Sequence, residues 1–215
     1  MKMKWTFCLL PMLAAPALAQ DIPPDCAPLV TIQSQGCFVR QVFTCASDSQ
    51  PLRWAASYGP NGPISLTVMD LGGMPLVMKI GKDKPRGTLD PFGDQADLAK
   101  ALAGETDRFS YQIKFDDGTA LWTSGTFDLT GAEAKIDGRS LPEMRRIETM
   151  VYPDGSSSPE LDNRLVYDAE LGLVINTTST DHATGKLLMD RTPVDFLFPG
   201  EAGADSVVPL YGCEG

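Results

Sequence analysis

The stretch RFSYQIKFDDGTALWTSGTFDL, residues 108–129, decides the fold class. Apolar residues occupy every second position of its first half: Phe109, Tyr111, Ile113 and Phe115. This alternation is typical of a strand with one buried and one solvated face. Asp117-Gly118 is a hairpin signal, and a second strand-like run follows it. The two runs are therefore predicted to pair antiparallel, because parallel strands need a longer crossover.

The same pattern of short apolar runs and tight turns continues along the chain. Further strand-like runs cover residues 53–58, 64–71, 76–80, 133–136, 144–152, 163–168, 173–179 and 186–198. Turn signals such as Asn61-Gly62 and Asp137-Gly138 separate them. We therefore predict a mainly β fold with one antiparallel meander sheet of about eight to ten strands, which curls into a half-barrel or barrel-like shape.

One segment has the pattern of a helix. Residues 94–105 carry an apolar stripe, with Asp94 as the expected N-cap and Gly104 as the expected end. This inserted helix is expected to fill the concave face of the sheet, and a ligand could share that space. Residues 26–35 are ambiguous, because Val30, Thr31 and Ile32 favour a strand although the flanking residues could cap a short helix.

The N-terminus resembles a secretory signal. Lys2 and Lys4 precede a short apolar run, and Ala17-Leu18-Ala19 forms a small-residue cleavage site. We expect residues 1–19 to be removed, leaving one domain over residues 20–215 in the periplasm of a Gram-negative bacterium or outside the cell. Without the two lysines the chain has 16 basic and 28 acidic residues, a net charge of −12. This charge argues against nucleic acid as a partner, and no later run is long enough for a transmembrane anchor.

Four cysteines remain in the mature chain: Cys26, Cys37, Cys45 and Cys213. An even number in an oxidising compartment predicts two disulfides. Cys37 and Cys45 cannot pair if residues 37–45 form a strand, because they would lie roughly 26 Å apart. A two-residue turn at Gln35-Gly36 would bring Cys26 opposite Cys45, so the favoured pairs are 26–45 and 37–213. The alternative, 26–37 with 45–213, remains open.

Catalytic signals are weak. His182 is the only histidine of the chain, and no nucleophile-elbow, phosphate-loop, dinucleotide or calcium-loop motif is present. Asp116-Asp117, Asp137 and Asp154 lie at predicted turns. We predict no catalytic residues, no metal site and no cofactor, and we expect a non-enzymatic role. Met69, Met74 and Met78 are interpreted as core residues rather than copper ligands.

One basic cluster stands out in this acidic chain. Lys79, Lys82, Lys84 and Arg86 lie on or beside a connecting loop, and they are a candidate patch for an anion or an acidic partner. Arg145 and Arg146 are adjacent, so in a strand their side chains would lie on opposite faces.

The secreted N-terminus, the paired cysteines, the hairpins and the closing PVDFLFPGE (193–201) together resemble small uncharacterised periplasmic β-rich proteins of alphaproteobacteria. A looser similarity is to periplasmic half-barrel carriers of lipids or lipoproteins, although this chain differs in its disulfides and its single helix. Neither resemblance transfers site residues. The expectation is a non-catalytic protein that binds an apolar ligand or an envelope partner in its concave face. The alternatives are a carboxylate-dependent hydrolase of envelope polymer and a structural accessory module.

Overall fold

The computed structural model describes residues 21–81 and 84–213, and the predicted signal peptide lies outside them. The chain forms one antiparallel sheet in the order β12-β11-β10-β9-β8-β7-β6-β5-β4-β3-β2-β1-β13. The elements are β1 (Cys26–Ser34), β2 (Phe38–Cys45), β3 (Arg53–Gly59), β4 (Gly62–Met69), β5 (Pro75–Ile80), β6 (Arg86–Leu89), α1 (Leu98–Leu102), β7 (Asp107–Phe115), β8 (Ala120–Ile136), β9 (Arg139–Val151), β10 (Leu161–Asp168), β11 (Leu173–Asp181), β12 (Leu187–Asp190) and β13 (Pro193–Leu197). No described helix is long and apolar enough to cross a membrane.

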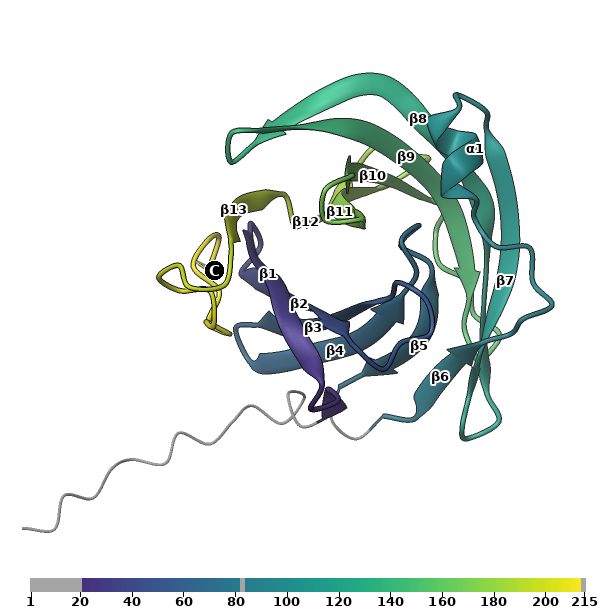
Figure 1. Ribbon diagram of the computed structural model, residues 1–215. Helices are drawn as coiled ribbons and strands as arrows, with labels where there is room; N and C mark the ends of the chain where they lie inside the picture. Colours follow the sequence, from purple (N-terminus) through teal and green to yellow (C-terminus); the bar gives the residue numbers. More distant parts are fainter. Residues whose placement is uncertain (1–20, 82–83, 214–215) are drawn as a thin grey trace, which may run out of the picture.

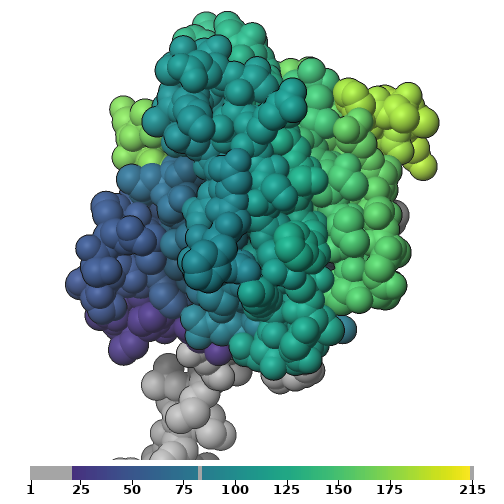
Figure 2. All heavy atoms as spheres, turned by 90° about the vertical axis from the view of Figure 1, so that its right-hand side faces the viewer, coloured from purple at the N-terminus to yellow at the C-terminus, as the bar shows by residue number. Residues whose placement is uncertain are grey.

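The predicted fold class is confirmed, with 13 strands instead of the expected eight to ten. The sheet curls around a central space, which Figure 1 shows end-on. In the space-filling view, the atoms of β6 to β9 form a continuous outer wall (Figure 2). Side chains alternate between this wall and the interior, as the period of two requires. The ladder is not closed, because β12 and β13 end the sheet without pairing with each other.

Two predicted strand boundaries were wrong. Residues 120–136 form a single long strand, β8, whose pairing with β9 is interrupted only by a bulge between Leu129 and Glu133. Residues 186–198 form two strands that lie at opposite ends of the sheet. The break occurs because the Asp190 carboxylate accepts hydrogen bonds from the backbone N (2.9 Å) and hydroxyl (2.7 Å) of Thr192, which makes a turn just before Pro193.

The predicted helix is much shorter than expected. It covers Leu98–Leu102, and Asp97, not Asp94, caps it by accepting hydrogen bonds from the backbone N–H groups of Ala99 and Lys100. Asp94 instead forms an isolated bridge with Ser110 of β7, which removes the first residues from the helix. Ala101 is buried in the same cluster as Phe109 and Met144, so α1 packs on the core.

The ambiguous segment 26–35 forms strand β1, and both favoured disulfides, Cys26–Cys45 and Cys37–Cys213, are present. The register that led to this pairing was partly wrong. The turn between β1 and β2 has three residues, with Gly36 (φ 67°) and Cys37 (φ 54°) in the left-handed region. A bulge between Pro28 and Val30 then shifts the register by one residue and restores Cys26 opposite Cys45.

The long β8–β9 hairpin crosses the gap between the two ends of the sheet. At its tip, Asp137 Oδ2 accepts a hydrogen bond of 2.9 Å from the backbone N of Phe196 in β13. Ile136 and Leu141 pack in one cluster with Val30 of β1 and Phe196. The hairpin therefore holds the curled sheet in shape where no ladder does.

Gly36 marks the point where the β1–β2 turn meets the β12–β13 link. A Cβ on Gly36 would overlap the carbonyl oxygen of Asp190, and the backbone N of the neighbouring Gln35 donates to Thr192 O at 2.9 Å. We expect Gly36→Ala to lower the free energy of unfolding by at least about 2 kcal/mol, from the left-handed backbone plus the overlap. Gly138→Ala is the matched control, because Gly138 has φ 72° and open space around its Cβ position. Urea unfolding should show a clearly smaller loss of unfolding free energy for Gly138→Ala. Equal losses for the two variants would contradict close packing between the β1–β2 turn and the β12–β13 link.

Candidate functional site

A cavity of about 270 Å³ lies inside the curled sheet, and we call it the lumen cavity. Eight strands, the β4–β5 loop and the β12–β13 link contribute its walls. Its residues are Arg40, Thr67, Met69, Gly73, Pro75, Met78, Tyr111, Ile113, Leu121, Thr123, Arg146, Glu148, Met150, Leu165, Val174, Asn176 and Arg191. Most of these side chains are apolar, as in typical small-molecule sites.

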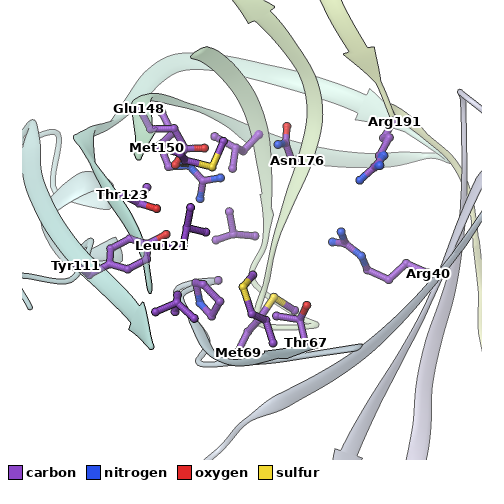
Figure 3. A pocket seen from close by; sticks show the side chains of 17 residues that line it. Arg40, Thr67, Met69, Tyr111, Leu121, Thr123, Glu148, Met150, Asn176 and Arg191 are labelled. Atoms are coloured by element: carbon purple, nitrogen blue, oxygen red, sulfur yellow. Dashed lines mark ion pairs between the residues drawn. The ribbon is translucent and has the colours of Figure 1, made fainter. Parts of the chain in front are cut away.

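One side of the cavity is mainly apolar. Strands β4, β5, β7 and β8 supply it, and Figure 3 shows Met69, Tyr111 and Leu121 on this side. Met69 was correctly predicted to be buried, and Met78 lines the cavity beside it. Thioether side chains are flexible and polarizable, so this wall can adapt its shape to different apolar groups.

Arg40 and Arg191 occupy the opposite side of the cavity, and Figure 3 shows both guanidinium groups pointing inward. Arg40 comes from the inner face of β2, between Phe38 and Val42, and Arg191 comes from the β12–β13 link. Both guanidinium groups contact the face of Phe38, at 5.4 Å for Arg40 and 4.2 Å for Arg191 from the ring centroid. These contacts compensate only part of the lost hydration of two cations.

A polar group that includes Glu148 lies on the side of Tyr111 and Leu121, opposite Arg40 and Arg191, and it is internally paired (Figure 3). Arg146 Nε lies 3.0 Å from Glu148 Oε2, although the two groups are not aligned as a hydrogen bond. Glu148 Oε1 accepts a hydrogen bond of 2.9 Å from Asn163 Nδ2, and the Ser179 hydroxyl donates to Asn163. As predicted, the neighbouring Arg145 is on the other face, where it binds Asp162 with two hydrogen bonds. Glu148 is thus already engaged by the chain itself.

The predicted basic patch lies apart from the lumen cavity. Lys79, Lys84 and Arg86 line a groove on the outer wall together with Trp54 and Val77. Lys79 forms an ion pair of 2.8 Å with Asp21, which reduces the charge available to a ligand. Lys82 lies outside the described residues.

Asp117, Asp154 and His182, which were considered as possible catalytic residues, lie in turns or on the surface and outside the lumen cavity. Asp117 and Asp154 accept hydrogen bonds from residues two positions later in their turns. His182 is exposed near Glu160 and Asp162, at 3.6 and 3.8 Å. Within residues 21–81 and 84–213, no group of three metal-ligating side chains is arranged to hold a metal ion.

Sequence reasoning missed Arg40, Glu148 and Arg191 as site residues. Arg40 had a usable signal, because alternation in FVRQVFTC places it on the same face as Phe38 and Val42. Comparison with protein-family models, curated proteins and solved structures finds no match for this chain. The function is therefore inferred from the geometry of the lumen cavity.

Proposed function

We propose that this protein is a non-catalytic binding protein of the periplasm or the cell exterior, and that its lumen cavity holds a small molecule with an apolar body. The observation that carries the proposal is the partly open cavity inside the curled sheet, with its mainly apolar lining. Its two disulfides fit an oxidising compartment. The volume of 270 Å³ corresponds to about nine water-sized positions, so the ligand, or its enclosed part, is small.

The paired-carboxylate hydrolase is supported less well. That chemistry needs two carboxyl groups facing each other across the substrate. Among the residues that line the lumen cavity, Glu148 alone is acidic, and Arg146 and Asn163 already contact it. An accessory module that pairs through a sheet edge would have little edge to offer at β12, since this strand has four residues.

The neutral fluorescent probe N-phenyl-1-naphthylamine should bind the wild-type protein with enhanced fluorescence, because the cavity is largely apolar. Thr67→Phe places an aromatic ring in the cavity, where it occupies volume that the probe needs. The probe then loses part of its apolar contact with the walls, and we expect its binding to weaken at least about tenfold. Ser124→Phe is the control, since Ser124 is exposed on β8 and does not line the cavity. Circular dichroism should confirm that both variants fold. Absent wild-type binding, or equal binding by Thr67→Phe, would overturn the proposal.

A further inference from the structure

The arginines of the described residues that have restricted solvent access differ in their partners. Most of those with restricted solvent access bind a carboxylate: Arg139 with Asp168, Arg145 with Asp162, Arg146 with Glu148 and Arg164 with Glu143. Arg40 and Arg191 form no ion pair and no side-chain hydrogen bond with any described residue, and the buried Nε of Arg40 has no partner. The chain has 28 acidic residues, so the missing partner reflects their placement and not a shortage of carboxylates.

Placing two unpaired cations together opposes folding. Their charges repel each other, and partial burial removes the hydration that would compensate for the loss. Burial, followed by repulsion from Arg191, lowers the pKa of Arg40 to about 10, which still leaves it charged at neutral pH. The cavity lining contains three arginines and one glutamate, a formal charge of +2 inside a protein whose overall charge is strongly negative.

We infer that the ligand of the lumen cavity is an amphipathic oxyanion, with a carboxylate or phosphate head between Arg40 and Arg191 and an apolar body against the opposite methionine-rich wall. Guanidinium groups match both heads geometrically, because their N–H donors bind two oxygens at once. The inference rests on the proposed function and adds the chemical class of the ligand. Asn176 lines the same cavity, and its buried Oδ1 lacks a hydrogen-bond partner, so the ligand can also carry a donor.

Decanoate, decyl phosphate and decanol separate the two parts of this inference, because they share one apolar chain. Displacement of N-phenyl-1-naphthylamine should show that at least one of the two anions binds about 10- to 100-fold more tightly than decanol, as expected for charged hydrogen bonds. Comparing the two anions distinguishes a carboxylate ligand from a phosphate ligand. Equal affinity for all three would overturn the inference and leave the proposed function intact. Absence of binding by all three would overturn both.

Substitution of the two arginines tests the site itself. Arg40→Met/Arg191→Met removes both charges but keeps the apolar stems, so it should abolish the preference for the anion and retain decanol binding. Since the change removes unpaired charges, the melting temperature of the ligand-free variant should not fall. Arg108→Met is the control, because Arg108 is exposed on β7 and lies outside the cavity. A folded double variant that still prefers the anion would exclude these residues as the head-group site.

Discussion

Asp168→Ala is expected to lower the free energy of unfolding by about 3 to 5 kcal/mol, the range for breaking a buried ion pair from one side. Asp168 is 1 % exposed and binds Arg139 through two hydrogen bonds, of 2.8 and 3.1 Å. The same carboxylate accepts hydrogen bonds from the backbone N–H groups of Glu170 (3.0 Å) and Leu171 (3.1 Å). Its removal leaves the two backbone N–H groups without a partner and leaves Arg139 only its contact with the exposed Glu170.

The position of the Arg139–Asp168 pair explains why its loss should destabilise more than the β10 end. Arg139 lies at the tip of the β8–β9 hairpin, and Asp168 ends β10. The hydrogen bond with Asp168 raises the pKa of Arg139, which favours the charged form that the ion pair needs. Arg139 also contacts the ring of Phe196 in β13 at 5.6 Å. The pair therefore fastens the hairpin tip at the gap between the two ends of the sheet.

Glu170→Ala is the matched control for Asp168→Ala. Glu170 also binds Arg139, at 2.7 Å, but its side chain is 82 % exposed. Exposed pairs of this kind contribute less than about 1 kcal/mol. Urea unfolding should therefore separate the two variants clearly. Similar losses for both would mean that burial of Asp168 contributes little to the stability of the hairpin tip.

The meander could be predicted from the sequence because each strand and each turn is specified by residues that are close together in the chain. Alternation within the strands and glycine at most turns are sufficient to place most strands, and most neighbours in sequence are neighbours in the sheet. The exception was the run 186–198, which has strand-like residues throughout. Only the curvature of the whole sheet brings its second half beside β1, and no pattern within the run encodes that contact.

The candidate site was harder to predict for the same reason. Its two unpaired arginines are 151 positions apart in the chain, at 40 and 191, and they line one cavity because the curl of the sheet brings its two ends near each other. The predicted basic patch was local in sequence, and three of its residues do gather in one groove, yet that groove lies on the outer wall. A charged residue within an apolar strand face, as in Phe38-Val39-Arg40, is the signal that should be weighed in similar sequences.

The disulfide between Cys37 and Cys213 should contribute more to stability than the one between Cys26 and Cys45. It spans 176 residues, whereas the other spans 19. In the chain-entropy model these loops correspond to about 5 and about 3 kcal/mol respectively. A small domain has a total stability of about 5 to 15 kcal/mol, so loss of the longer link is severe.

The comparison requires that both variants keep the native contacts around the missing link. Without the Cys37–Cys213 bond, Gln33 still binds the C-terminal segment through Val208 O (3.2 Å) and Leu210 N (3.1 Å). The C-terminal segment can therefore stay in place, and the main effect of Cys37→Ser/Cys213→Ser is a freer unfolded chain. Guanidinium unfolding should show a larger loss for this variant than for Cys26→Ser/Cys45→Ser. The reverse order would show that local strain at the β1–β2 hairpin, and not loop length, determines the stabilisation.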